Sequence, residues 1–112
     1  MPKLNQPLPN DARVVSRREI VHALDRGEIE LGQAIRRMRL ELTGLNQTRF
    51  GKIVGLSANT ISAIERDADA ASLKNLKRIF RRFGMQLTMR HQSMLSESSS
   101  EVGEIDRFSK SL

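Results

Sequence analysis

Residues 58–66 combine side chains that can read the edges of DNA bases. On a helical wheel, Ile61 and Ile64 fall together and mark a buried side. The opposite side is small and polar, with one long cation and no acid, and consists of Ala58, Asn59, Ser62, Ala63 and Arg66. Asparagine can pair with adenine through two hydrogen bonds, serine can bond to several bases, and alanine can contact the thymine methyl group. This face therefore predicts a helix that enters the major groove of DNA; a merely solvated helix is the alternative.

Such a helix needs a second element to position it, because isolated helices shorter than about 12–15 residues are marginal in water. Residues 47–54 predict another short helix directly before it. The two are joined by Gly55, which we expect at positive φ, by Leu56, and by Ser57, which caps the second helix. Two helices joined in this way form a helix-turn-helix, in which the first helix crosses the DNA backbone and the second enters the groove.

The first helix of this pair adds further candidates. Gln47 is placed either to bind a phosphate or to brace the second helix, and Lys52 is a candidate phosphate contact. Gly51 has no side chain to hold the two helices apart, so it permits their close approach. The predicted DNA-binding residues are Gln47, Thr48, Lys52, Ser57, Ala58, Asn59, Thr60, Ser62, Ala63 and Arg66.

The segment before this pair predicts two more helices. Ser16 and Glu19 fit a capping box at the start of a first helix, which Gly27 can end in the left-handed conformation. Apolar residues at helical spacing predict a second helix over about residues 31–42.

The segment after the pair predicts a last helix and a strand. Ser72 caps the helix and Gly84 ends it; then apolar and polar residues alternate, which is typical of a strand. A lone strand leaves its backbone groups unpaired, so we expect residues 85–90 to pair with their own copy across a two-fold axis. Pairing with residues 13–15, or a dimer through the last helix, are the alternatives. The predicted dimerisation residues are Met85, Leu87 and Met89.

Together these elements predict an all-α fold of about five helices with one short C-terminal strand that pairs across a dimer. We expect three regions. Residues 1–15 hold all three prolines and predict a flexible arm, residues 16–91 form the DNA-binding domain with its dimerisation strand, and residues 92–112 form a disordered, acidic and serine-rich tail. Residues 16–91 carry 15 Lys and Arg against 8 Asp and Glu, a net charge of +7, whereas residues 92–112 carry 2 against 4, a net charge of −2. A basic body of this kind favours a polyanionic partner.

Several classes of protein lack support in the sequence. The chain has no cysteine, so it can form neither a disulfide framework nor a cysteine zinc site, and its two histidines, His22 and His91, have no spaced ligand partners. No phosphate-binding loop or nucleophile elbow occurs. We therefore expect no enzyme, no metal and no cofactor. No run of 18 apolar residues and no secretory leader are seen, so we expect no membrane span and a cytoplasmic protein.

The chain resembles the Xre/Cro/C1-type helix-turn-helix family over residues 31–83. The family's common form is Thr-Gln, then Leu-Ala, then Gly-apolar-Ser, then Thr-Ile-Ser and Ile-Glu. The matching positions here are Asn46-Gln47, Phe50-Gly51, Gly55-Leu56-Ser57, Thr60-Ile61-Ser62 and Ile64-Glu65. The resemblance implies a lambda-repressor-like fold and a homodimer that binds a palindromic DNA operator as a sequence-specific transcriptional repressor.

The chain departs from this pattern at four points. Asn46 replaces Thr, Phe50 replaces Leu and Gly51 replaces Ala. One extra residue lies between Arg39 and Gln47, which implies that the helix or the loop at this point is slightly longer than in the family.

Glu65 is expected to pair with a cation of the helix over residues 31–42. It follows Ile64, which faces inward, and a carboxylate near the core needs a compensating charge. Arg39 is the best candidate, and the resemblance implies the same pair.

The layout of a helix-turn-helix, the segment "GMQLTMR" and a polar tail is also similar to HipB-type antitoxins. In that family the strand pairs across a dimer, and the dimer represses its own operon and holds a HipA-type kinase toxin. This similarity implies a HipA-type kinase among the partners. The alternative function is a protein-binding antitoxin or adaptor whose DNA binding is secondary.

Overall fold

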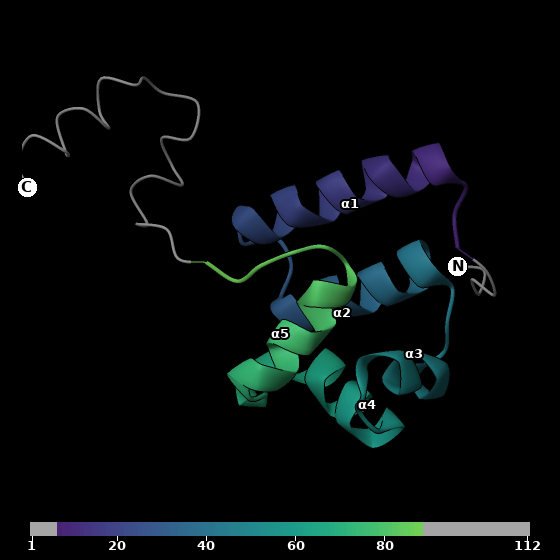
Figure 1. Cartoon of the computed structure of the whole chain (residues 1–112). Coiled ribbons are helices and arrows are strands. Elements are labelled where there is room, and N and C mark those ends of the chain that lie inside the picture. Colours follow the sequence, from purple (N-terminus) through teal and green to yellow (C-terminus); the bar gives the residue numbers. More distant parts are fainter. Residues whose placement is uncertain (1–6, 89–112) are drawn as a thin grey trace, which may run out of the picture.

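A computed structural model describes residues 7–88 of the chain, and within this range the fold is entirely helical (Figure 1). No strand occurs among these residues. The elements, in chain order, are α1 (Asn10–Asp25), α2 (Leu31–Met38), the π-helical turn η1 (Arg39–Thr43), α3 (Gln47–Val54), α4 (Ala58–Arg66), the 3-10 turn η2 (Ala68–Ala70) and α5 (Leu73–Arg82).

Helix α2 is the centre of the arrangement. It packs against α1 on one side and against α4 on the other, and α5 contacts α3. Figure 1 shows α1 running along α2, with the α3–α4 pair at the opposite side of the molecule. The predicted helices over residues 47–54 and 58–66 are confirmed.

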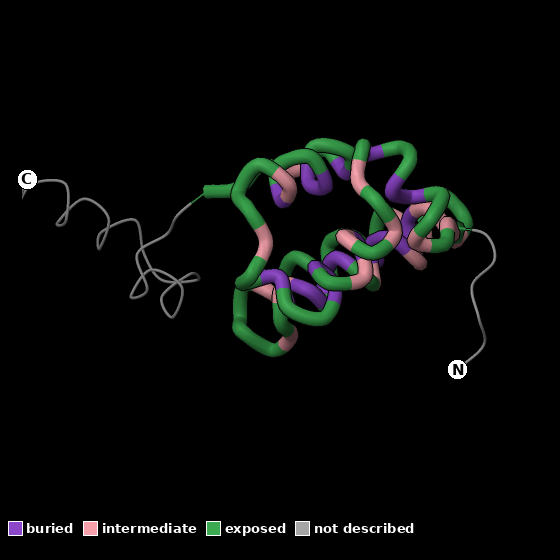
Figure 2. The backbone as a smooth tube through the Cα atoms, turned by 90° about the horizontal axis from the view of Figure 1, so that it is seen from below, coloured by how far each residue is buried: buried purple, intermediate pink, exposed green. Residues whose placement is uncertain are grey.

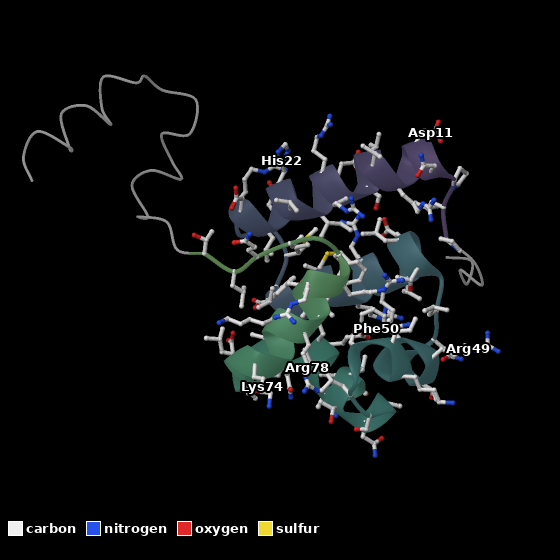
Figure 3. All side chains as sticks on the ribbon, viewed as in Figure 1. Asp11, His22, Arg49, Phe50, Lys74 and Arg78 are labelled. Atoms are coloured by element: carbon white, nitrogen blue, oxygen red, sulfur yellow. The ribbon has the colours of Figure 1, made fainter. Side chains whose placement is uncertain are left out.

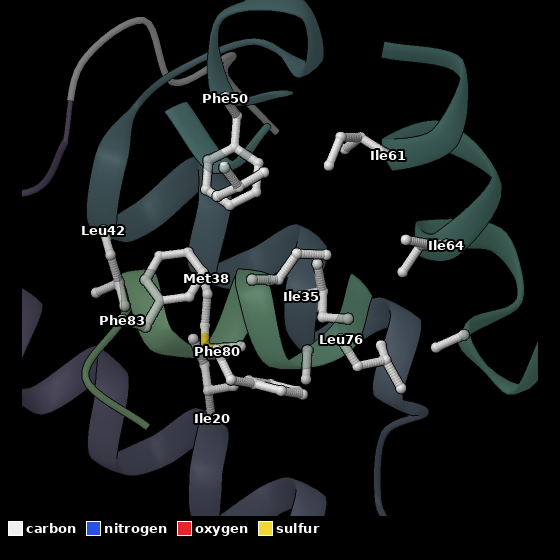
Figure 4. Packing of buried hydrophobic residues seen from close by; sticks show 14 residues of the cluster. Ile20, Ile35, Met38, Leu42, Phe50, Ile61, Ile64, Leu76, Phe80 and Phe83 are labelled. Carbon is white, nitrogen blue, oxygen red and sulfur yellow. The ribbon is translucent and has the colours of Figure 1, made fainter. Parts of the chain in front are cut away.

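The core forms where these helices face one another. The buried stretches of the backbone lie along the inward sides of the helices (Figure 2). Phe50 of α3 stacks on Phe83, which follows α5, with ring centroids 5.7 Å apart (Figure 4). Aromatic pairs at this separation add to the stabilisation that burial provides. The largest fully buried side chains are Phe50, Ile20, Ile35, Met38, Ile61 and Ile79.

The start of the first helix differs from the prediction. Helix α1 begins at Asn10, directly after Pro9, so residues 10–15 are helical and not part of a flexible arm. Proline suits a helix start because its fixed φ is compatible with the first turn and its missing N–H would have no partner there. The predicted capping role of Ser16 is therefore wrong: Ser16 is buried within α1.

Ser16 instead joins a polar network between α1 and η1. Its hydroxyl donates a hydrogen bond to the Glu41 carboxylate, which also accepts one from Arg37 Nε at 3.0 Å. The backbone N–H of Leu8 donates to the Glu41 carbonyl oxygen at 3.1 Å. Glu41 thus anchors the N-terminal segment and α1 to the turn that follows α2.

The C-terminal strand is not seen in the described part of the chain. Residues 85–88 have no regular structure, and Met89 and Arg90 lie outside the described residues, as does the predicted tail at 92–112. A strand is defined by its hydrogen bonds to a partner strand. With a single copy of the chain present, the predicted pairing of residues 85–90 across a dimer stays a prediction.

The Glu41 network predicts a pH-dependent contribution to stability. Burial raises the pKa of Glu41, but the hydrogen bonds from Arg37 and Ser16 and the charge of Arg37 outweigh it, so the pKa lies below its ordinary value. The charged form is therefore favoured by folding, and its contribution is present above about pH 4.3, the ordinary value for glutamate, and is lost as the pH falls through the lower folded value.

We expect Glu41→Gln to lower the free energy of unfolding by about 1 kcal/mol at pH 7, since it replaces a charged acceptor by a neutral one. Below about pH 4 the difference from the wild type should shrink towards zero. Urea unfolding of both proteins at pH 7 and at pH 3 measures this change. A difference that is the same at the two pH values would contradict the role given to the Glu41 charge.

Candidate nucleic-acid interface

The turn between α3 and α4 has the predicted geometry. Asn46 caps α3 by accepting a hydrogen bond from the Arg49 N–H at 2.8 Å, and Ser57 caps α4 by accepting one from the Thr60 N–H at 3.1 Å. Gly55 lies between them at φ 80°, a conformation that side-chain-bearing residues rarely adopt. The predicted positive φ of Gly55 and the Ser57 cap are both confirmed.

Gly51 is required by the turn. A Cβ atom at Gly51 would lie 2.3 Å from the Leu56 carbonyl oxygen, and the Leu56 N–H donates to the Gly51 carbonyl at 2.8 Å. The expected close approach is therefore confirmed, and the atom that comes close belongs to the turn. An alanine, which the related pattern has at this position, would force the backbone of the turn to shift.

Gly32, for which no role was predicted, allows the same kind of close approach where α2 and α4 cross. A Cβ atom there would lie 2.4 Å from the Glu65 carbonyl oxygen. The available signal was a glycine inside a helix of strongly amphipathic pattern, where it is destabilising unless close packing requires it.

A buried ion pair holds α4 against α2, as predicted. Arg39 Nε donates to Glu65 Oε2 at 2.7 Å and Arg39 Nη2 to Glu65 Oε1 at 3.0 Å, and the two side chains are only 6% and 3% exposed. Gln47 Nε2 also donates to Glu65 Oε1 at 3.1 Å, so Gln47 braces α4. The third Arg39 nitrogen, Nη1, donates to the Leu45 carbonyl oxygen at 2.8 Å. Two-point contact between guanidinium and carboxylate fixes orientation as well as distance.

The segment between Arg39 and Gln47, where the sequence has one residue more than the family pattern, contains the π-helical turn η1. The Gly44 N–H donates to the Arg39 carbonyl oxygen at 3.0 Å, the wider spacing of a π-helical turn, and Gly44 itself is left-handed at φ 68°. The prediction of one regular helix over residues 31–42 is therefore partly wrong: the α-helix ends at Met38, and a π-helical turn follows it. Arg39, which pairs with Glu65 of α4, is the first residue of this π-helical turn.

The outward face of α4, which we call the recognition face, consists of the residues predicted from the helical wheel. Ile61 and Ile64 are buried in the core, whereas Asn59, Ala63 and Arg66 are exposed. Ala58, Thr60 and Ser62 are partly exposed at its edges. On α3, Thr48 and Lys52 are exposed as well.

The segment from the start of α3 to Ile64 carries only positive charge. From residue 47 to residue 64 the chain carries Arg49 and Lys52 and no acid. The first carboxylate after this stretch is Glu65, which Arg39 neutralises inside the molecule. Figure 3 shows Arg49 at the outer end of α3. A cationic, acid-free surface with small polar side chains is suited to a phosphate-lined groove.

The described residues contain neither a metal site nor a membrane span. Between residues 7 and 88, no group of three His, Asp or Glu side chains is placed to hold a metal ion. Within the same range no helix combines the length and the apolar character needed to cross a membrane.

The Arg39–Glu65 pair, which holds α4 in place, should contribute strongly to the free energy of unfolding. Glu65→Ala leaves the Arg39 guanidinium buried without its partner, so we expect a loss of about 3–5 kcal/mol in the free energy of unfolding. The matched control is Glu28→Ala, which removes the exposed Arg26–Glu28 pair and should leave stability almost unchanged. Urea unfolding of both variants measures the two effects. Equal losses would contradict a special role for the buried pair.

Comparison with known proteins gives one finding for this arrangement. No curated protein and no solved structure matches the chain. Residues 35–89 match the model of the helix-turn-helix family, a range that begins in the middle of α2 and leaves α1 outside. The match includes the turn, the recognition face and the Arg39–Glu65 pair. Residues 35–89 therefore form a helix-turn-helix domain of the Xre/Cro/C1 type.

Proposed function

We propose that this protein is a sequence-specific transcriptional repressor that binds a palindromic DNA operator as a homodimer in the cytoplasm. The observation that carries the proposal is the recognition face of α4, which is exposed, small, polar and free of acids. Its helix is fixed from behind by the buried Arg39–Glu65 pair. A rigid helix with these side chains is the part with which helix-turn-helix proteins read the major groove.

The candidate residues fall into two roles. Asn59, Ser62 and Arg66 are proposed to contact base edges or nearby phosphates, and Ala58 and Ala63 allow the helix to approach the groove closely. Four of the remaining candidates lie at or near the N-termini of α3 and α4, where free N–H groups also favour phosphate: Gln47, Thr48, Ser57 and Thr60. Lys52 lies in the last turn of α3 and is proposed to bind phosphate through its charge. Gln47 donates a hydrogen bond to Glu65, so its proposed contribution is to brace α4.

Dimerisation is proposed to involve residues 85–90. Met85 is half-buried against the core, whereas Leu87 is 38% exposed and available to a second copy. The two-fold symmetry of such an antiparallel pair suits a recognition helix that needs two half-sites about 34–36 Å apart. The predicted alternative of strand pairing with residues 13–15 is wrong, because these residues are α-helical within α1. A dimer through α5 stays the alternative.

The first experiment is a mobility shift with DNA from the region upstream of the protein's own gene. A specific complex that survives competitor DNA supports the repressor. Absence of any complex would favour the alternative, a protein-binding antitoxin or adaptor. The proposed HipA-type kinase partner is tested separately, by copurification of such a kinase from cells that express both proteins.

Asn59→Ala should weaken binding to the cognate operator by about 1–3 kcal/mol and relax the base preference at one position, because asparagine recognises adenine through two hydrogen bonds. The measurement is a set of dissociation constants for operators substituted one base pair at a time, at fixed salt. Unchanged cognate binding would show that the recognition face has been assigned wrongly.

Lys52→Ala is the matched comparison on the neighbouring helix. If Lys52 contacts a phosphate, its loss should weaken all sequences alike and reduce the slope of log K against log salt by about 1. A change in base preference would contradict this assignment.

Leu87→Pro should dissociate the dimer, since proline cannot donate a hydrogen bond to a partner strand. Leu87→Val keeps the N–H and is the control. Sedimentation at micromolar concentration distinguishes the two states, and circular dichroism checks that each variant is folded. A folded dimer of the proline variant, or a monomeric wild type, would contradict the strand interface.

A further inference from the structure

Helix α5 presents a strongly basic surface that the recognition face does not include. Its buried side consists of Leu76, Ile79 and Phe80. Its other sides are exposed and carry five cations and no acid, a surface that we call the basic face: Lys74, Lys77, Arg78, Arg81 and Arg82.

These cations lack counter-charges. In the described part of the chain the ion pairs are Arg26–Glu28, Arg37–Glu41 and Arg39–Glu65, and none involves α5. Like charges three and four residues apart on a helix repel one another. The helix dipole favours cations only near the C-terminus, whereas Lys74 lies in the first turn of α5, where a cation is unfavourable. The stability of α5 therefore does not explain why all five cations are present on its exposed face.

The basic face lies beside the helix-turn-helix. Arg78 Nη1 donates a hydrogen bond to the carbonyl oxygen of Gly55 at 3.1 Å, in the turn just before the N-terminus of α4. In Figure 3, Lys74 and Arg78 lie on one side of α4, and Arg49 of α3 lies on the other. The recognition helix is thus flanked by cations from two different helices.

We infer that the basic face of α5 binds the phosphate backbone of the operator on one side of the groove, while the cations of α3 bind the backbone on the other side. The inference rests on the proposed function and extends it. One DNA strand carries a negative charge per about 3.4 Å of helix axis, and a helix of ten residues is about 15 Å long, so α5 can span several phosphates of one backbone. Phosphate contacts fix the position of a protein on DNA and add affinity without adding base preference.

The test removes two charges that have no internal contact. In the double variant Lys74→Gln/Lys77→Gln, Arg78 and its bond to Gly55 are kept. The slope of log K against log salt should fall by about 2, and operator affinity should fall roughly 10- to 100-fold near 0.15 M salt. The ratio of cognate to scrambled-site affinity should stay the same. A second double variant, Lys74→Arg/Lys77→Arg, keeps the charges and should retain the wild-type slope.

The matched control is Arg17→Gln/Arg18→Gln, which removes two exposed charges from α1, on the side of α2 away from α4 (Figure 1). This control should leave slope and affinity close to those of the wild type. Equal effects in the α1 and α5 variants would show a general effect of net charge and would overturn the inference.

The remaining outcomes separate the inference from the proposed function. If the wild type binds its operator and the α5 variant has unchanged affinity and slope, the basic face does not contact DNA and only the inference fails. If the wild type binds no DNA, both fail. Thermal unfolding checks that each variant is folded.

Discussion

The buried ion pair between Arg39 and Glu65 is the interaction on which the position of the recognition helix depends. It joins the end of α2 to the end of α4, and Gln47 adds α3 to the same carboxylate. Charges buried at this depth are strongly unfavourable unless each has its partner. The pair is therefore compatible with one arrangement of the three helices, and the core packs around that arrangement. The Glu65 carboxylate is neutralised inside the molecule, so it does not offset the exposed cations of α3.

Those parts of the fold that depend on neighbouring residues could be predicted from the sequence. The turn between α3 and α4 needs a left-handed glycine and a capping serine, and Gly55 and Ser57 supply both within three residues. The burial of Ile61 and Ile64 follows from helical spacing alone. That Glu65 needs a cation also follows from local reasoning, whereas its partner Arg39 lies 26 residues away and was indicated by the family resemblance as well.

Other features depend on contacts that the sequence does not reveal. Ser16 has the local pattern of a helix cap, but its hydroxyl is used by Glu41, 25 residues away in the chain. An inserted residue after Arg39 indicates a longer segment without showing that this segment contains a π turn. The close contact at Gly32 becomes evident only when α2 and α4 are seen to cross. Whether the proposed residues contact DNA, and whether residues 85–90 pair, depends on molecules outside a single chain.

The two close glycine contacts have a consequence for how this domain can change over time. At Gly32 and Gly51 it is the backbone that meets the backbone, so the recognition helix and its turn are located by atoms that every amino acid shares. The exposed side chains of Asn59 and Ala63 have no part in this packing. Substitutions there can change the exposed surface of α4 while the scaffold stays intact. If this face reads DNA as proposed, new specificities can evolve by a few surface replacements, without a compensating change in the core.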